Sequence, residues 1–506
     1  MKMKTVNIIN FVRGIDEIRG NEVIYNSFFK EVDLIQRYNF PATWLLQYDA
    51  LITGPYVECL KKHHAPGIEY GIWLEMDRYL AEDAGVEWKG RMIWDYYANC
   101  AFTLGYTHEE RIKLCDTFVE KFTQVFGTKP KVMGAWCFDA FTLNYLYEKH
   151  GITGACNCKD QQGTDGYTLR GGYFANAYYP SINNSYMPAQ SVEKQIPVPV
   201  FRMLGSDPLH QYDCAFEDEF QLVISMEPIY KHAGGDPEWV DWYLRETYTR
   251  PSLAMAYTQV GQENSFPAGE IFPGLEMQFE KIRDLQEKGL LVVENLGTSA
   301  AKFREQFSIT PATAVTTLTD WRQPASAGVW YLCCNYRINF FQTPDGKLQI
   351  RSWNLFDENF PERNLVEPLT DKNCVLETLP LWDSYAWDRA FFGLHDSGGH
   401  IEKVEEDRDT ETLKIYWQSA AGDCCITCTP QTVRMDFAGE TAVLDMELAA
   451  AMDAEITAAA EQEIFMRYRN WDYKIELSAG KIIQNEHNLK FVAENGILEF
   501  RTGKLS

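Results

Sequence analysis

Short apolar runs alternate with longer amphipathic stretches over the first 300 residues, and this alternation restricts the fold more than any other feature of the sequence. Parallel strands that are buried on both faces read as short apolar runs, and helices connect them. Eight runs have this character: Thr5–Val12, Ala42–Leu46, Ile68–Leu74, Lys131–Cys137, Ile152–Cys156, Val198–Leu204, Leu253–Val260 and Leu290–Asn295. Seven or eight β/α units predict a closed, TIM-like α/β barrel, with an open doubly wound sheet as the alternative. No Gly-x-Gly-x-x-Gly or Walker A sequence follows any run, which weakens a nucleotide-binding open sheet.

Helices are predicted between these runs, where apolar residues recur at three- and four-residue spacing. The predicted helical stretches are 28–38, 107–126, 141–150, 239–248 and 275–288. Thr107 and Glu110 have the spacing of a capping box, and Gly151 has the position of a helix C-cap.

The pattern changes after Pro311 to short runs separated by turn residues, which is typical of antiparallel strands. The predicted strands are Val329–Tyr336, Lys347–Asn354, Leu413–Gln418, Cys424–Thr429, Thr441–Leu448, Glu463–Arg469 and Leu489–Val492. Asp345-Gly346 and 494–496 read as hairpin turns, while the Ala-rich stretch 449–460 fits either a helix or a strand. Because 506 residues exceed the size of a single core, we expect two domains: a barrel over residues 1–310 and a mostly β domain, a β-sandwich, over 320–506.

Charge and composition exclude several classes of partner. The net charge of −25 disfavours nucleic acid and anionic lipid, and no apolar run is long enough to span a membrane. The N-terminus lacks a signal-peptide pattern, and the thirteen cysteines read as reduced thiols, so a cytoplasmic location is expected, although a chain trimmed at its N-terminus would look the same. Aromatic residues make up 14% of the chain, and those at strand ends suit the stacking of a sugar ring. We expect a carbohydrate or another small molecule as ligand and no cofactor, and the sequence leaves the oligomeric state open.

Reactive groups of β/α barrels lie at the C-terminal ends of the strands, and several carboxylates follow the predicted runs here. The candidates for catalysis are Glu263, Asp139, Asp160 and Glu75. Each could instead be structural, and Asp139 has the position of a helix N-cap. The strand ends also supply Trp73, Trp136 and Arg202 as candidate binding residues, and Arg202 should meet a carboxylate because an unpaired buried charge is costly.

The segment from Lys159 to Pro197 is too long for an ordinary barrel loop and is rich in tyrosine, so we expect an ordered lid over the mouth. It would supply Tyr167, Tyr173 and Tyr178 for stacking, and Asp165 and Asp160 for hydrogen bonds to sugar hydroxyls. The alternative is a loop that packs on the second domain or on another subunit.

No metal site is predicted, since the nine histidines are scattered and Cys425 and Cys428 have no second pair nearby. No Gly-x-Ser-x-Gly nucleophile motif is present.

Two stretches of sequence resemble a known family. The run 160–173 and the run 201–208 look like a bacterial family of unknown function, and 41–46, 71–75 and 126–136 are similar in layout to the glycoside hydrolase/deacetylase barrel superfamily. The resemblance implies a barrel with an appended β domain. Polysaccharide deacetylases that resemble this barrel bind a metal through an Asp pair and a His pair, but Asn10–Arg13 and Trp73–Glu75 stand here, so metal-dependent deacetylation is disfavoured.

Two hypotheses on function follow. In the first, the protein is a glycoside hydrolase that uses Glu263 with Asp139, Asp160 or Glu75 as its carboxylate partner. In the second, it is a carbohydrate-binding or scaffold protein that has kept the barrel without the chemistry. The distance between the mouth carboxylates separates the two hypotheses.

Overall fold

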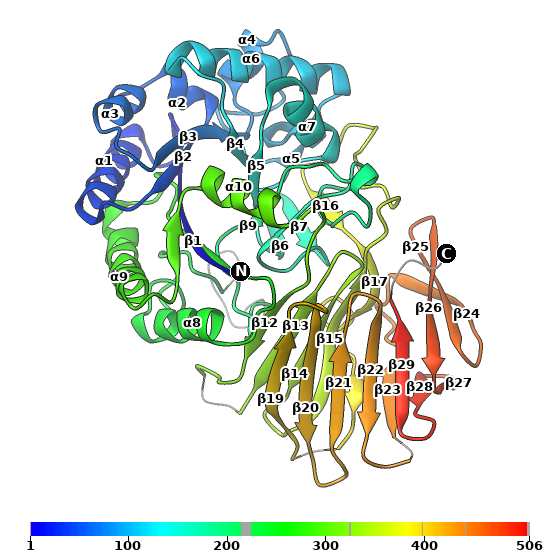
Figure 1. The fold of residues 1–506 in the computed structure, drawn as a ribbon. Coiled ribbons are helices and arrows are strands. Elements are labelled where there is room, and N and C mark those ends of the chain that lie inside the picture. Colours follow the sequence, from blue (N-terminus) through cyan, green and yellow to red (C-terminus); the bar gives the residue numbers. More distant parts are fainter. Residues whose placement is uncertain (1, 214–223, 323–324, 397, 441, 503–506) are drawn as a thin grey trace.

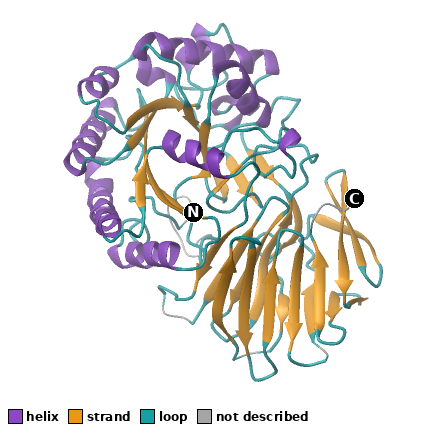
Figure 2. Cartoon of the chain, viewed as in Figure 1, coloured by secondary structure: helices purple, strands orange, loops and turns teal. Residues whose placement is uncertain are grey.

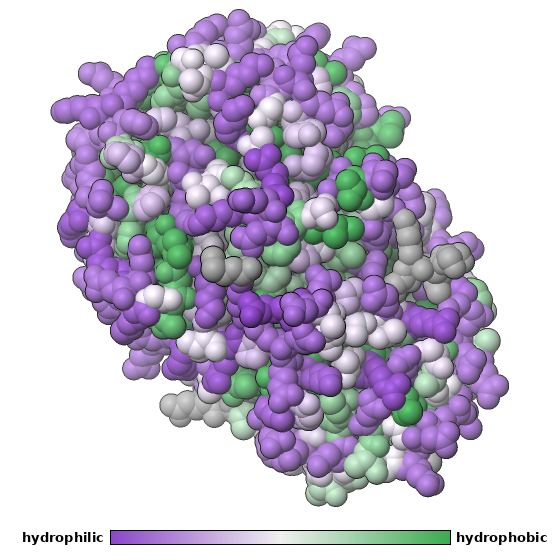
Figure 3. Space-filling view, viewed as in Figure 1, coloured by the Kyte–Doolittle hydropathy of each residue, from purple (hydrophilic) through white to green (hydrophobic). Residues whose placement is uncertain are grey.

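The computed structural model describes residues 2–213, 224–322, 325–396, 398–440 and 442–502. Helices surround a curved sheet in the N-terminal region, and antiparallel sheets make up the C-terminal region (Figures 1 and 2). The face of the molecule in Figure 3 is mainly hydrophilic, with scattered apolar side chains. No helix among the described residues has both the length and the apolar character needed to cross a membrane.

A nearly closed sheet forms the centre of the N-terminal region. Its order is β10-β1-β2-β3-β4-β5-β9-β8, and β11 also pairs with β1. The strands are β1 (Met3–Val12), β2 (Ala42–Leu46), β3 (Ile68–Trp73), β4 (Val132–Gly134), β5 (Gly154–Asn157), β8 (Ala177–Tyr178), β9 (Val200–Arg202), β10 (Met255–Val260) and β11 (Val292–Glu294). All eight predicted runs therefore form strands.

The barrel differs from a TIM barrel in two ways. Strand β8 runs antiparallel to β9, and no pairing among the described residues joins β8 or β9 to β10. In addition, β10 and β11 both pair with the first half of β1, so they occupy its two edges, and β2 pairs with its second half. The barrel prediction is confirmed, whereas the regular ring of β/α units is not.

The predicted helices are present around this sheet. The helices of the N-terminal region are α1 (Asn21–Tyr38), α2 (Tyr48–Ile52), α3 (Tyr56–Lys62), α4 (Arg78–Asp83), α5 (Ala98–Ala101), α6 (His108–Phe126), α7 (Ala140–Tyr145), α8 (Pro237–Thr249), α9 (Ala268–Glu287) and α10 (Leu296–Gln306). Thr107 and Glu110 form the predicted capping box of α6. Helix α7 continues as a π-helical turn, Leu146–His150, and Gly151 ends it with a φ of 75°.

Two antiparallel sheets stack on each other in the C-terminal region, and the β domain is confirmed. One has the order β12-β13-β14-β15-β18-β23-β28-β27, with β17 on β15, and the other has the order β19-β20-β21-β22-β29-β26-β25-β24. Trp353 of the first sheet packs on Phe500 of the second with ring centroids 5.1 Å apart. The strands are β12 (Thr313–Thr317), β13 (Ala327–Leu332), β14 (Tyr336–Gln342), β15 (Leu348–Leu355), β17 (Leu379–Asp383), β18 (Phe392–Leu394), β19 (His400–Asp407), β20 (Thr412–Gln418), β21 (Cys424–Cys428), β22 (Thr432–Phe437), β23 (Val443–Glu447), β24 (Ala454–Ala459), β25 (Glu463–Tyr468), β26 (Trp471–Ala479), β27 (Lys481–Gln484), β28 (Asn488–Val492) and β29 (Ile497–Arg501).

Local turn chemistry explains where the strand predictions succeed and where one fails. Asn495 and Gly496 have positive φ angles of 52° and 75°, as a tight hairpin requires. The single strand predicted over 329–336 is wrong, because the chain reverses after Cys333, whose N–H donates to the carbonyl of Tyr336 at 3.0 Å. The Ala-rich stretch contains strand β24.

The long segment after β5 links the two regions. It begins with a hairpin of β6 (Gln161–Thr164) and β7 (Tyr167–Arg170), and β7 pairs in parallel with β16 (Cys374–Glu377) of the C-terminal region. The segment is therefore held from the barrel side and from the β-domain side. The division at residues 310–320 stays a prediction.

Candidate active site at the mouth of the barrel

Side chains that follow four strands meet in one pocket at the C-terminal ends of the barrel strands. Arg13 follows β1, Glu75 follows β3, Trp136 follows β4 and Glu263 follows β10. The space between these side chains is about 590 Å³, which includes the open solvent at the mouth. Its lining residues are Arg13, Arg19, Glu75, Trp94, Tyr96, Phe102, Trp136, Cys158, Lys159, Gln161, Asp165, Tyr167, Glu227, Glu263 and Phe266.

Arg13 joins two carboxylates in the centre of this pocket. Its Nη2 atom lies 3.1 Å from Oε2 of Glu75 and 3.3 Å from Oε2 of Glu263. Glu75 also accepts hydrogen bonds from the indole N–H groups of Trp73, at 2.9 Å, and Trp94, at 2.8 Å. The guanidinium group of Arg13 stacks on Trp94, 3.6 Å from the ring centroid. Both oxygens of Glu75 are thus held in place by charged or aromatic donors.

Backbone contacts position Arg13 and Glu263 together. Phe11 of β1 and Glu263 form a parallel bridge, and the N–H of Asn264 donates to the carbonyl of Phe11 at 3.2 Å. The Asn264 side chain accepts from the N–H of Arg13 at 2.8 Å and donates to its carbonyl at 3.0 Å. Asp49 accepts from the next two backbone N–H groups, of Gly14 and Ile15, at 2.8 Å each. The turn after β1 is therefore rigid, which places the Arg13 side chain reproducibly.

Two carboxyl groups at the mouth bind protons more tightly than usual. Burial raises the pKa of Glu263, and the neighbouring charge of Glu75 adds to this effect, although Arg13 opposes it. Asp165 is an exposed residue, but it lines the pocket, and loss of solvent around its carboxyl group together with the charges of Glu263 and Glu75 raises its pKa to about 6. Carboxyl groups with raised pKa values next to an ion-paired carboxylate are typical of acid–base sites.

Aromatic rings form the walls of the pocket. Trp136 is half-buried, Tyr96 is exposed, and Tyr167 lies buried in strand β7. Trp73 is not a wall residue; it packs behind the pocket, with its ring centroid 5.0 Å from that of Trp136. Flat rings around carboxylates provide apolar faces for the C–H groups of a sugar.

A buried ion pair completes the mouth and was not among the predicted site residues. Lys159 Nζ lies 2.8 Å from Oε1 of Glu227, and both side chains are almost fully buried. Lys159 follows strand β5 closely, so its position could have been read from the strand pattern. Glu227 comes two residues after Ser225, which forms an isolated bridge with Ser206, and no apolar run of strand length precedes this position in the sequence.

Asp160 and Arg202 do not line the mouth; they belong to a buried network. Asp160 binds Arg202 at 2.9 Å and Arg337 of β14 at 2.6 Å, and it also accepts from Tyr186. Although burial opposes ionisation, the two guanidinium groups lower the pKa of Asp160 below its ordinary value. The expectation that Arg202 meets a carboxylate is confirmed. The predicted catalytic role of Asp160 disagrees with this structure, because Arg202 and Tyr186 bind its Oδ1 atom and Arg337 of the C-terminal region binds its Oδ2 atom.

Asp139 is also structural. It caps α7 by accepting from the N–H of Thr142 at 2.8 Å, and it forms an ion pair with Arg111 at 2.9 Å. Both side chains of this pair are completely buried. The geometry therefore supports the N-cap alternative for Asp139 and does not support a catalytic role.

The predicted lid is present only in its first part. The β6–β7 hairpin contributes Gln161, Asp165 and Tyr167 to the pocket. Tyr173 and Tyr178 were expected to stack on a ligand, but both are fully buried in the core. Their hydroxyl groups donate to the backbone carbonyls of Pro311, at 3.0 Å, and Ser185, at 2.7 Å. The prediction for these two residues is wrong, because the chain turns inward after β7.

The mouth residues do not fit a divalent metal ion. Arg13 places a positive charge between the two central carboxylates, where a cation would have to bind. Within the described ranges, no three His, Cys, Asp or Glu side chains are grouped as metal ligands. We therefore assign no step to a metal.

No model of a known protein family matches the sequence, and no curated protein matches it either. Among solved structures, a Parabacteroides distasonis protein described as a glycoside hydrolase/deacetylase superposes with a TM-score of 0.52 at 14% identity, over 74% of this chain and 91% of that chain. Proteins described as polysaccharide deacetylases from Mycobacterium smegmatis and Pseudomonas aeruginosa PAO1 have TM-scores of 0.36 and 0.37 at 10% and 12% identity, each over 60% of this chain and 92% of that chain.

The first of these similarities shows that this chain shares its fold with the Parabacteroides distasonis protein. It leaves the chemistry to be argued from the site. The narrower resemblance to one bacterial family stays a prediction.

Proposed function

We propose that the protein is a carbohydrate-active hydrolase that cleaves a glycosidic bond at the barrel mouth. The observation that supports this function is the pair Glu75 and Glu263, which share one Arg13 nitrogen and face an aromatic-walled pocket. Because Oε2 of each residue binds the same nitrogen, at 3.1 and 3.3 Å, these two oxygens lie at most about 6.4 Å apart, a bound that admits the roughly 5–5.5 Å of retaining glycosidases and lies just below the roughly 6.5–9.5 Å of inverting ones. The geometry thus favours a retaining mechanism.

The environments of the two carboxyl groups suggest their roles. Glu263, whose pKa is raised, donates its proton to the glycosidic oxygen as the bond to the anomeric carbon breaks. Glu75 accepts hydrogen bonds at both of its oxygens, as a carboxylate does, so it attacks that carbon and forms a glycosyl ester. Glu263 then takes a proton from water, and the resulting hydroxide equivalent releases the sugar and restores Glu75.

Nitrophenyl glycosides of the common monosaccharides test this proposal. Glu263→Gln and Glu75→Gln should each lower kcat/KM by at least about a thousandfold. Glu305→Gln, which removes an exposed carboxylate from α10, is the matched control and should leave turnover unchanged. Azide should restore turnover to Glu75→Ala, because a small anion can replace the missing nucleophile. Turnover that survives both glutamine variants would exclude this carboxylate pair.

One observation favours the second hypothesis, a carbohydrate-binding protein without catalysis. Arg13 neutralises part of the charge of both central carboxylates, and Lys159 engages Glu227, so these three acids already have cationic partners. A binder would turn over no glycoside, yet it would bind a sugar in calorimetry, and Trp136→Ala would weaken that binding.

A further inference from the structure

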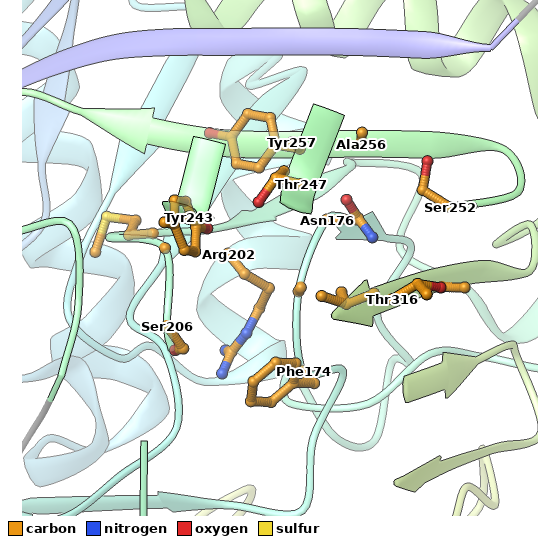
Figure 4. Close-up of a pocket in the computed structure, with 15 residues that line it drawn as sticks. Phe174, Asn176, Arg202, Ser206, Tyr243, Thr247, Ser252, Ala256, Tyr257 and Thr316 are labelled. Atoms are coloured by element: carbon orange, nitrogen blue, oxygen red, sulfur yellow. The ribbon is translucent and has the colours of Figure 1, made fainter. Parts of the chain in front are cut away.

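The C-terminal region meets the barrel at the open side of the sheet and again at the mouth. At the open side, strand β12 lies over the break between β9 and β10, and the two regions close around a small cavity (Figure 4). This cavity has room for only a few water molecules and shares no lining residue with the mouth pocket. The contact at the open side therefore joins the two regions without reaching the mouth.

Two segments of the barrel region form the rim of the mouth pocket. The first, which we call the rim loop, is residues 94–102, and the second is the β6–β7 hairpin. Together they supply six of the fifteen residues that line the pocket. These six residues are Trp94, Tyr96, Phe102, Gln161, Asp165 and Tyr167. The width of the mouth therefore depends on where the rim loop and the hairpin lie.

Residues 369–377 of the C-terminal region, which include β16, bind both segments through the backbone, and we call these residues the clamp. On the side of the rim loop, the N–H of Ala98 donates to the carbonyl of Lys372 at 2.8 Å. On the side of the hairpin, the N–H of Cys374 donates to the carbonyl of Gly166 at 2.8 Å, and β16 continues in parallel with β7. None of the clamp's residues, all of which the structure describes, lines the pocket. The clamp can therefore act on the pocket only through the two segments that it holds.

Side chains reinforce both sides of this junction. The ammonium group of Lys372 lies 4.5 Å from the ring centroid of Tyr97 in the rim loop. At the other end of the hairpin, Arg170 pairs with Asp453 of the C-terminal region at 2.6 Å. The rim loop and the hairpin are thus tied to the C-terminal region as well as to the barrel.

Gly166 is the point at which the rim loop, the hairpin and the clamp meet. Its φ angle is 76°, and a methyl group added to its Cα would lie 2.8 Å from the carbonyl oxygen of Tyr96 and 2.9 Å from that of Lys372. Both distances are too short for a methyl carbon and an oxygen. Because both oxygens belong to the backbone, neither can rotate away from a side chain at this position. The lack of a side chain on Gly166 is therefore what allows the three segments to close together.

We propose that the clamp positions the mouth: it holds the rim loop and the hairpin at a fixed separation, and Gly166 is the positioning residue at their junction. The C-terminal region then serves substrate binding without supplying a side chain to the pocket. Arg13, which joins the carboxylates Glu75 and Glu263, lies outside the two clamped segments, so the clamp governs binding more than bond cleavage. This kinetic consequence rests on the proposed function, whereas the closure of the three segments does not.

Gly163 of the same hairpin provides a matched control for Gly166. It also has a positive φ, 63°, but a methyl group there would meet no described atom within 4 Å. Alanine is disfavoured by the backbone at both positions, so only Gly166→Ala should also separate the segments. Hydrogen exchange is measured by mass spectrometry on peptides that cover 94–102, 161–170 and 369–377. We expect at least tenfold faster exchange in all three peptides of Gly166→Ala and less than a twofold change in Gly163→Ala.

Kinetics with nitrophenyl glycosides separates positioning from a general loss of stability. Gly166→Ala should raise KM five- to tenfold and leave kcat within threefold, because the rim binds the ground state and the transition state alike. Gly163→Ala should change neither constant by more than twofold. If the wild type hydrolyses no nitrophenyl glycoside, the proposed function fails, while hydrogen exchange still decides whether the three segments close together.

Hydrogen exchange of the wild type in increasing urea tests the clamp even if Gly166→Ala does not fold. The three peptides should lose protection at the same urea concentration, because they open as one unit. Loss of protection at different urea concentrations would overturn the proposal, and so would an equal effect of the two alanine variants. Faster exchange spread evenly over the whole chain of Gly166→Ala, or a lowered kcat with an unchanged KM, would also overturn it.

Discussion

His210 connects the barrel side of the molecule to the C-terminal region through two carboxylates. Its Nδ1 atom lies 3.0 Å from Asp213 and its Nε2 atom lies 2.9 Å from Asp320. Asp213 also binds Arg351 of β15 at 2.9 Å. Burial disfavours the charged imidazole, but the two hydrogen bonds and the charge of Asp207 outweigh this effect and raise the pKa of His210 from 6.5 to about 9. His210 is therefore a cation at neutral pH.

The substitution His210→Gln should destabilise the protein in a pH-dependent way. The pKa is higher in the folded state, so the charged imidazole contributes its full stabilisation below pH 6.5 and loses it as the pH rises to about 9. A shift from 6.5 to about 9 corresponds to about 3 kcal/mol, at roughly 1.4 kcal/mol per pKa unit. We expect the variant to lose about 3 kcal/mol of unfolding free energy at pH 6 and only a small part of this at pH 9.5.

Urea unfolding followed by tryptophan fluorescence measures this difference at pH 6 and pH 9.5. His395→Gln is the matched control, because His395 also pairs with an aspartate, Asp445 at 3.2 Å, but its side chain is 59% exposed. Exposed pairs contribute about 0–1 kcal/mol, so this control should change little. An equal loss for His210→Gln at both pH values, or a loss no larger than that of His395→Gln, would refute the reasoning.

Three further predictions concern buried groups. Glu31 is buried, its two oxygens lack a partner among the described residues, and burial together with the charge of Glu263 raises its pKa. Glu31→Gln should therefore stabilise the protein by about 1–3 kcal/mol, and the gain should grow as the pH rises. A lower unfolding temperature of the variant at pH 8 would contradict this. Asp160→Asn should lower the free energy of unfolding in urea by about 3–5 kcal/mol, because it leaves the buried guanidinium groups of Arg202 and Arg337 poorly paired. An unchanged urea midpoint would contradict a stabilising role of these ion pairs. Tyr173→Ala should lower the free energy of unfolding by about 3–5 kcal/mol because it truncates a core side chain, whereas Tyr96→Ala at the mouth should change it little. A larger loss of stability in Tyr96→Ala than in Tyr173→Ala would contradict the core position of Tyr173.

The positions of the mouth residues follow in part from the sequence alone. Glu75, Trp136 and Glu263 each come just after an apolar run that proved to be a strand, and strand ends of a barrel meet at one mouth. The same reasoning also predicted Asp139 and Asp160 as catalytic residues, because both follow strands. A carboxylate after a strand can face the mouth, cap the next helix or bind a distant arginine, and the sequence does not distinguish these outcomes.

Contacts between residues far apart in the chain determine which of these roles each carboxylate has. Asp160 is paired with Arg337, 177 positions away, and Arg13 is paired with Glu263, 250 positions away. Tyr173 lies in the core, where its hydroxyl group donates to the carbonyl of Pro311 and forms a hydrogen bond with the hydroxyl group of Thr313. The hydrophobic period of the sequence does not predict such partners, because it depends only on residues a few positions apart.

Strands, helices and turns were set by the sequence itself, since hydrophobic period, the capping box at Thr107 and the Asn495-Gly496 turn act locally. Tertiary packing alone determined the break in the barrel between β9 and β10, the strand β12 that closes over it, and the cavity between them. The physical reason is that local propensities act over one turn or one hairpin, whereas a cavity and an ion pair depend on where several distant segments meet.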